Sequence, residues 1–412
     1  MSAECLGHGS VCIDCVDRTL LDPHSNESIY AAYDIISGAT VEERPLLQQC
    51  LGLTMNPDGL LHDHYIRTFY KPRDHTLRDW MHMLVNSGVA NTECAQLINA
   101  LSDRGIQIST ISAYMMTFVL PRRNGRVEES WVSKKRMGKK RESLQSFSGI
   151  LLSIVQLLVA FLLDTFTRPC EFDAHIECFV TLWQLLGVCS LGPVDAVPHV
   201  DLLRKLIEKH GALFVTLYGQ HVKPKFHHLL HVTENVEFLG RLLSCFVTER
   251  KHRQTKRATV WHVRHIDNSV LTDLVSELCD GFAGDAGTLL DRQYLVDPKA
   301  FQLGDHTFYH SKHAALECGM VSAGDLVYTT TGAICKVINF WSGNVDSYEN
   351  MSVRVEAYTP SHSGPERWTT TTPTSATFDV ACIMDAVMWA PCAVGEVRVI
   401  PPFKAQLADV RP

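Results

Sequence analysis

The stretch GILLSIVQLLVAFLL, residues 149–163, is the most apolar window of the chain. It has 15 residues and includes Ser153 and Gln156, whereas a membrane-spanning helix needs about 20 apolar residues. We therefore expect a core helix that is buried by other helices, with a membrane span as the alternative. The surrounding sequence, from Leu144 to about Gly240, also has a helical pattern, so this window predicts a mainly helical domain.

The character of the sequence changes near residue 310. Short runs rich in Thr, Val and aromatic residues alternate there with Gly, Pro and Ser clusters, a pattern typical of antiparallel strands. We expect a small β-barrel or sandwich at this end, and hence an α+β, mostly helical chain. The predicted domains are a Cys-rich N-terminal segment at 1–60, a mainly helical domain at 61–310 and a β-rich domain at 311–412.

Composition limits the class of protein and its compartment. With 412 residues, of which 46% are apolar and 20% charged, the chain is long enough for two or three globular domains. Its net charge of -7 gives no overall sign of a nucleic-acid partner, although basic residues cluster locally. The 14 cysteines are scattered, and the N-terminus lacks the basic start and apolar core of a signal peptide. We expect reduced thiols in a cytosolic or nuclear protein.

Three histidines stand close together in KPKFHHLLH, residues 223–231. His227 and His231 are four residues apart, so a helix places both on one side, which is one known way to hold zinc. The segment lacks the glutamate of the HExxH zinc proteases, which makes that enzyme class a poor fit. The alternative is a set of metal-free histidines that pack beside Leu229 and Leu230.

A glutamate, Glu249, heads a strongly basic run. The residues that follow it include Arg250, Lys251, His252, Arg253, Lys256 and Arg257. A carboxylate beside such a stripe can hold Mg²⁺ or Mn²⁺ while the cations bind the DNA backbone. A solvated helix face with an internal ion pair explains the same residues.

Two further patterns offer metal ligands. In DWMH, Asp79 and His82 are three residues apart, so a helix places them on one face, where both could ligate a metal or Asp79 could orient His82. An aspartate at a helix N-terminus is the alternative. Cys5, His8, Cys12 and Cys15 are residues of the types that bind structural zinc. They are more closely spaced than the ligands of an ordinary zinc finger. Free thiols would explain these four as well.

Taken in order, these segments resemble one family of enzymes. A CxxC near the start, the DxMH pair, the long helical region, KPKFHHLLH and the run CFVTERKH follow one another as in the C-terminal half of transposases of the CACTA–Mirage–Chapaev (En/Spm-like) group. The similarity covers roughly residues 70–260, and its most specific part runs from KPKFHHLLH to ERKH. The matching positions are Asp79, His82, Lys223, Pro224, Lys225, His227, His231, Glu249, Arg250, Lys251 and His252.

The resemblance implies a ribonuclease-H-like fold, here as a partial core with a large helical insertion between Asp79 and Glu249. In such enzymes three acidic residues hold two Mg²⁺ ions that promote hydrolysis of the transposon end, and the freed 3′-hydroxyl then attacks target DNA. By this resemblance Asp79, His82 and Glu249 belong to the catalytic centre. The residues expected to bind DNA are Lys223, Lys225, Arg250, Lys251, Arg253, Lys256 and Arg257.

One part of the family pattern is not recognisable. The first two catalytic acids should lie upstream of Asp79, yet only 78 residues precede it, and no convincing strand leads to Asp14, Asp17 or Asp34. We therefore expect a truncated or domesticated copy that binds DNA in the nucleus and does not cut it by itself. If the chain is active, the implied reaction is that of a DDE-type transposase. The alternative is a non-enzymatic protein-interaction or chromatin-associated module with structural His and Cys residues.

Overall fold

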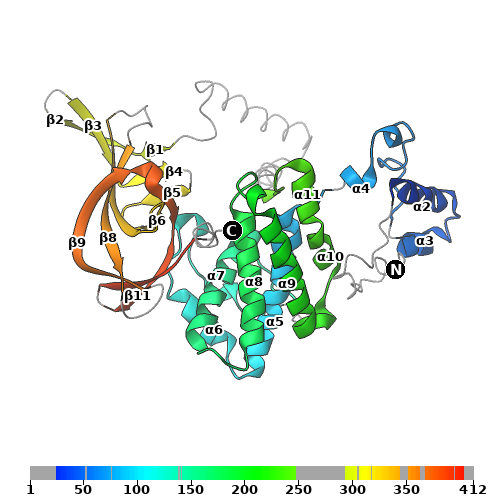
Figure 1. Ribbon diagram of the computed structural model, residues 1–412, viewed down its shortest axis with the longest axis horizontal. Coiled ribbons are helices and arrows are strands. Elements are labelled where there is room, and N and C mark those ends of the chain that lie inside the picture. Colours follow the sequence, from blue (N-terminus) through cyan, green and yellow to red (C-terminus); the bar gives the residue numbers. More distant parts are fainter. Residues whose placement is uncertain are drawn as a thin grey trace, which may run out of the picture. The chain divides into compact units, whose positions relative to one another are not determined.

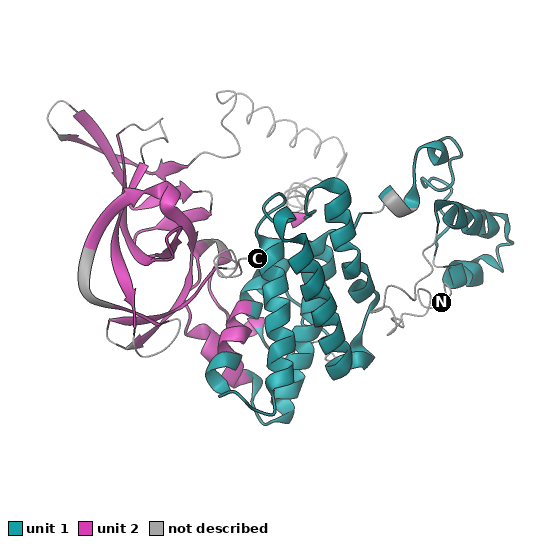
Figure 2. Ribbon diagram, viewed as in Figure 1, with its two compact units in different colours: residues 1–108, 132–155, 162–244 teal, residues 109–131, 156–161, 245–412 magenta. Residues whose placement is uncertain are grey.

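The computed structural model describes residues 25–51, 53–75, 77–137, 140, 142–246, 293–303, 306–316, 318–343, 351–361, 367–393 and 395–402. Within these residues α-helices occur up to Leu239 and antiparallel strands from Tyr294 onward, so the predicted α+β class is confirmed. The chain forms two compact units (Figure 2). Unit 1 comprises residues 1–108, 132–155 and 162–244, and unit 2 comprises residues 109–131, 156–161 and 245–412. The predicted boundary at residue 311 therefore falls inside the strand-forming region.

The first described helices of unit 1 are α2 (Asn26–Gly38), α3 (Arg44–Leu51) and α4 (Pro72–His75), and α2 packs against both of the others. Ser25 starts α2, because its side chain accepts a hydrogen bond from the Ser28 N–H at 3.1 Å and so satisfies a donor that the helix leaves unpaired. Tyr33, which is fully buried, donates its hydroxyl to the Asn56 carbonyl at 2.7 Å and ties α2 to the loop that follows α3.

The larger part of unit 1 is a group of long helices that pack side by side (Figure 1). Helix α8 packs against α5 and α9, while α9 also packs against α10 and α11. Their bounds are Val89–Asp103 for α5, Asp173–Ser190 for α8, Val200–Tyr218 for α9, Pro224–Leu230 for α10 and Val232–Leu239 for α11. The predicted break near Ser87 and Gly88 is confirmed, since α5 begins directly after it. The helix before the break is a five-residue π-helix, η4 (Met81–Val85).

Helix α7 (Ser148–Thr165) contains the apolar window. Among the described residues it is the only helix long and apolar enough to cross a membrane, and 61% of it is buried inside the protein. Residues 153–162 are all buried, including Ser153 and Gln156. The structure therefore agrees with the prediction of a core helix.

Unit 2 is built on antiparallel strands that form a curled sheet and a small three-stranded sheet. The large sheet has the order β10-β6-β7-β8-β9-β12-β11, with the hairpin β2–β3 attached to β7, and the small sheet has the order β1-β4-β5. Side chains alternate between buried and more exposed along β7 and β8, which gives one face to the core. That core is made of residues such as Val337, Phe340 and Val353. The predicted β-rich domain is thus present as a curled antiparallel sheet.

The strands have the following bounds in chain order. They are β1 Tyr294–Val296, β2 Lys299–Leu303, β3 His306–Ser311, β4 His313–Leu316, β5 Gly319–Ser322, β6 Leu326–Thr329, β7 Ile334–Ser342, β8 Met351–Pro360, β9 Arg367–Asp379, β10 Ile383–Ala386, β11 Met388–Ala393 and β12 Glu396–Ile400.

One buried arginine ties the early segments of unit 2 to its sheet. Arg398 on β12 donates to the Tyr114 hydroxyl at 2.6 Å and to the Ala160 carbonyl at 3.4 Å. Tyr114 lies on α6 (Ile108–Met116). Nearby, Val119 and Trp389 of β11 exchange backbone hydrogen bonds of 2.7 and 3.1 Å. These contacts explain why residues 109–131 and 156–161 belong to the strand-rich unit.

We predict that truncating a buried leucine of α7 destabilises the protein far more than truncating an exposed one. Leu158 is 0% exposed and Leu163 is 43% exposed. Leu158→Ala leaves a cavity in a packed core and should lower the free energy of unfolding by about 2–5 kcal/mol, and Leu163→Ala by less than about 1 kcal/mol. Urea unfolding of the two variants checks this. Equal effects would contradict a buried α7.

Candidate functional site

Asp79 and His82 are in contact at the start of the π-helix η4. The Asp79 carboxylate accepts backbone hydrogen bonds from Met81 at 3.0 Å and His82 at 3.2 Å, and it also contacts Nδ1 of the His82 ring. Asp79 is buried, whereas the His82 side chain is 34% exposed. The carboxylate thus caps the π-helix and orients the imidazole, which are two of the roles that the sequence left open.

At Gly88, where the turn formed by η4 ends, the structure leaves no room for a side chain. Ser87 has a positive φ of 51°, and Gly88 follows it as the N-cap of α5. A Cβ on Gly88 would lie 2.3 Å from the Met83 carbonyl oxygen. The Asn91 side chain accepts from the Gly88 N–H at 2.9 Å and donates to the Leu144 carbonyl at 2.8 Å. The backbone that carries Asp79 and His82 is therefore held in one conformation.

Lys225 joins this turn to the KPKFHHLLH segment. Its ammonium group donates to the carbonyl oxygens of His82 at 2.9 Å and Asn86 at 2.7 Å, across more than 130 residues of sequence. Burial lowers the pKa of Lys225, while the nearby Asp79 carboxylate opposes that shift. A second link is the bond from the Arg78 N–H to Oδ1 of Asn235, at 2.7 Å. Two of the three segments that carry the family resemblance therefore lie together.

His227 and His231 face one another with their Nε2 atoms 3.2 Å apart. The other nitrogen of His231, Nδ1, lies 2.8 Å from Oε2 of Glu234, so a carboxylate orients this ring. Metal-binding histidines commonly have such a carboxylate partner. The two residues that the sequence proposed as zinc ligands are thus positioned to hold one ion between them.

The environment of His227 and His228 favours neutral rings. Burial is the main cause that lowers the pKa of His227 and of His228 to about 4, and neighbouring histidines and Arg78 add to the effect. The Nδ1 atoms of both rings are buried and have no hydrogen-bond partner within the described part of the chain. A neutral imidazole can ligate a metal, and it can also pack in a core. The geometry is compatible with both interpretations of the sequence.

The same segment has a packing role. Phe226 lies 4.4 Å from Phe214 between ring centroids and stacks parallel to His210 at 6.3 Å. Leu229 and Leu230 are buried. The segment therefore anchors α10 on α9 by apolar contacts, while Lys225 ties it to the η4 turn.

The third segment of the resemblance lies outside the described residues. This applies to Glu249, Arg250, Lys251, His252, Arg253, Lys256 and Arg257, and equally to the N-terminal Cys5, His8, Cys12 and Cys15. Of the other predicted DNA-binding residues, Lys223 is half-buried, and burial lowers its pKa while Glu142 opposes that shift. The roles assigned to these residues stay predictions.

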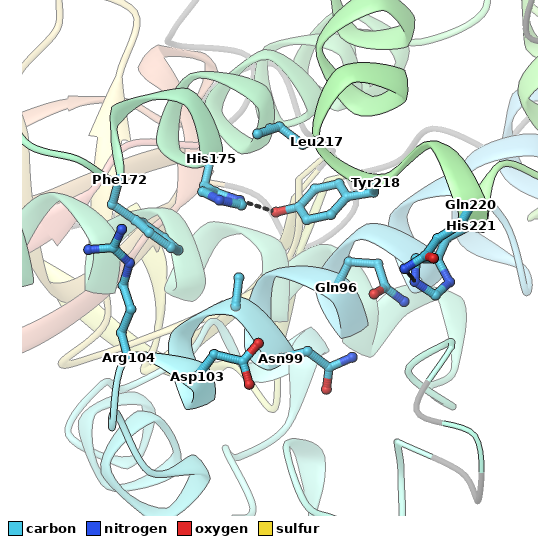
Figure 3. Close-up of a pocket in the computed structure, with 11 residues that line it drawn as sticks. Gln96, Asn99, Asp103, Arg104, Phe172, His175, Leu217, Tyr218, Gln220 and His221 are labelled. Atoms are coloured by element: carbon cyan, nitrogen blue, oxygen red, sulfur yellow. Dashed lines mark hydrogen bonds between the residues drawn. The ribbon is translucent and has the colours of Figure 1, made fainter.

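Unit 1 also contains a polar cavity of about 350 Å³ that sequence reasoning missed (Figure 3). His175 and Tyr218 face one another in it, with the hydroxyl 2.6 Å from Nδ1. The His175 ring stacks on Phe172 with centroids 4.4 Å apart. Helix α5 contributes four residues to the lining of the cavity, namely Gln96, Asn99, Ala100 and Asp103. The only signal in the sequence is that these positions repeat every three or four residues along one helix face.

No protein-family model matches this chain, and no curated protein matches its sequence. The function is therefore inferred from the residues and their geometry.

We predict that Lys225→Met weakens the fold. The change keeps much of the apolar stem but leaves the carbonyl groups of His82 and Asn86 without their shared donor, which should lower the free energy of unfolding by about 1–3 kcal/mol. Lys205→Met, on the exposed face of α9, is the matched control and should have little effect. Chemical denaturation measures both. Equal stabilities would show that the Lys225 contacts contribute nothing.

We predict that acidification destabilises the protein through His227 and His228. Because folding lowers the pKa of each from 6.5 to about 4, the unfolded chain binds more protons than the folded chain between these values. The stabilisation is complete above pH 6.5 and is lost as the pH falls toward 4. We expect a loss of about 1–2 kcal/mol, reduced because both rings are partly solvated.

Urea unfolding between pH 7 and pH 4.5 measures this loss. The double variant His227→Gln/His228→Gln should show a shallower pH dependence, while His64→Gln, at an exposed position, should match the wild type. A double variant as sensitive to pH as the wild type would refute the assignment.

Proposed function

We propose that this chain is a transposase-derived nuclear protein that binds duplex DNA. The observation that supports the proposal best is the contact of Lys225 with the turn that begins at Asp79 and His82. These residues belong to two separate motifs of the resemblance, and the fold brings them together. A chain that shared the motifs by chance would have no reason to place them side by side.

The helical part of unit 1 fits the same proposal. In the transposases that the chain resembles, a large helical insertion separates the DxxH pair from the final glutamate. Helices α5 to α11 lie between Asp79 and Glu249. We assign these helices to that insertion. In a ribonuclease-H-like arrangement, Asp79 and His82 then precede the helical insertion and Glu249 follows it.

DNA binding is assigned mainly to the basic stripe after Glu249. Lys225 already donates to two carbonyl oxygens, and Lys223 is half-buried, so both are less suited to phosphate contacts than fully exposed cations. The stripe supplies Arg250, Lys251, Arg253, Lys256 and Arg257 within eight residues. Such a density of cations supports a sequence-independent hold on the phosphate backbone.

Catalysis is not part of the proposal. Before Tyr294, the described residues form no strand that could hold further carboxylates beside Asp79, and Asp79 itself is used to cap η4. If the chain were active, Mg²⁺ or Mn²⁺ would be the cofactor. Plasmid nicking that requires either ion and is lost in Glu249→Ala would contradict a purely DNA-binding role.

A second candidate is a protein-interaction or chromatin-associated module in which these histidines are structural. The half-buried, neutral character of His227 and His228 favours it. The two candidates differ in their response to salt, because only phosphate contacts release bound counterions. An interaction module would not bind duplex DNA at moderate salt.

We predict that the full chain binds a 30-base-pair duplex with an affinity that falls steeply as salt rises. Five phosphate contacts give a slope of about −4 to −5 in a plot of log affinity against log salt concentration. Arg250→Gln/Lys251→Gln should reduce the magnitude of this slope by about 2, and Lys205→Gln should not change it. Fluorescence anisotropy across a salt series measures the slopes. No binding at about 50 mM salt would refute the proposal and favour the interaction module.

A further inference from the structure

Three buried side chains from three helices of unit 1 meet at one point. They are Glu93 on α5, Cys178 on α8 and His210 on α9, and each is at most 1% exposed. One carboxylate oxygen, the thiol sulfur and one ring nitrogen all lie within 4.8 Å of one another. Nε2 of His210 is 2.5 Å from Oε2 of Glu93. None of these residues belongs to the motifs that led to the proposed function.

The cluster is not satisfied by its own hydrogen bonds. The second carboxylate oxygen, Oε1 of Glu93, is buried and has no hydrogen-bond partner in the described part of the chain. A buried carboxylate with an unpaired oxygen is unfavourable, because the protein does not replace the water that it loses. The surroundings are otherwise largely apolar, since Cys178 packs in a cluster with Phe214 and Tyr218. Burial and the nearby Glu93 raise the pKa of the Cys178 thiol.

We propose that Glu93, Cys178 and His210 form a zinc site that joins α5, α8 and α9. The donor set of oxygen, sulfur and nitrogen suits Zn²⁺, whereas Mg²⁺ and Ca²⁺ require mainly oxygen ligands. The ion pairs the otherwise unpaired carboxylate oxygen and binds Cys178 as a thiolate, whose proton is released to solvent. The His210 ring is held in place for this role by its stacking on Phe226.

The polar cavity of Figure 3 lies next to this site. Tyr218 and His175 line the cavity, and Tyr218 also packs in one cluster with Cys178. Zinc with three protein ligands keeps a fourth position for a small ligand such as water. The hydroxyl and imidazole of the cavity wall are groups that can hydrogen-bond such a water. The inference concerns an ion that joins three helices and is independent of DNA binding.

Elemental analysis of the purified full chain tests the proposal. After dialysis against excess zinc and removal of loosely bound ions, the wild type should contain one more equivalent of zinc than Cys178→Ser. The matched control is Cys189→Ser, which alters another buried cysteine on α8 outside the cluster and should retain the wild-type content. The difference in zinc content between the variants reports this site alone, because zinc bound by other cysteines or by His227 and His231 contributes equally to each variant.

Cobalt substitution gives a second measurement. Chains refolded with Co²⁺ should show a thiolate-to-cobalt absorption band that is weaker in Cys178→Ser than in the wild type and Cys189→Ser. Glu93→Gln is nearly isosteric and should fold even if Cys178→Ser does not, and we expect it to bind zinc at least tenfold more weakly. Equal zinc content and affinity in the wild type and Glu93→Gln, or an unchanged cobalt band in Cys178→Ser, would show a metal-free network and overturn the proposal.

Discussion

The ammonium group of Lys225 and the carboxylate of Asp79 hold the two ends of one short π-helix. Asp79 accepts the N–H groups at the start of η4, and Lys225 donates to the carbonyl groups of His82 within η4 and of its C-cap Asn86. Each charge has the sign that stabilises the helix end it contacts. A π-helix of five residues has little stability of its own. These two charges, together with the sterically required Gly88, therefore set where the turn lies against α10.

This arrangement gives the KPKFHHLLH segment more than one role. Lys225 fixes the neighbouring turn, Phe226 packs on Phe214 and His210, and His227 and His231 bring their ring nitrogens together. A segment whose residues contact several helices tolerates few substitutions. That constraint would preserve the motif whether or not it takes part in chemistry, so the motif alone does not distinguish an active enzyme from a derived binding protein.

Local patterns predicted the parts of the fold that depend on local preferences. The break at Ser87 and Gly88, the buried helix α7 and the antiparallel strands near the C-terminus follow from glycine placement, apolar length and β-type alternation. The cavity and the Glu93 cluster could not be predicted in this way. Helix α5 is buried on all sides from residue 89 to 98. A periodic pattern predicts that the polar face of a helix is exposed to solvent, but here the polar residues lie in the core. Their partners on α8 and α9 are distant in sequence and come close to α5 only in the tertiary fold.

The bond between Arg398 and Tyr114 spans 284 positions of sequence. Unit 2 therefore cannot be completed during synthesis until β12 has left the ribosome, whereas the last residue of unit 1 is already 244. During that interval the early segments of unit 2, with the apolar side chains of α6, lack their final partners. Residues 109–131 and 156–161 are therefore made well before the strands with which they pack.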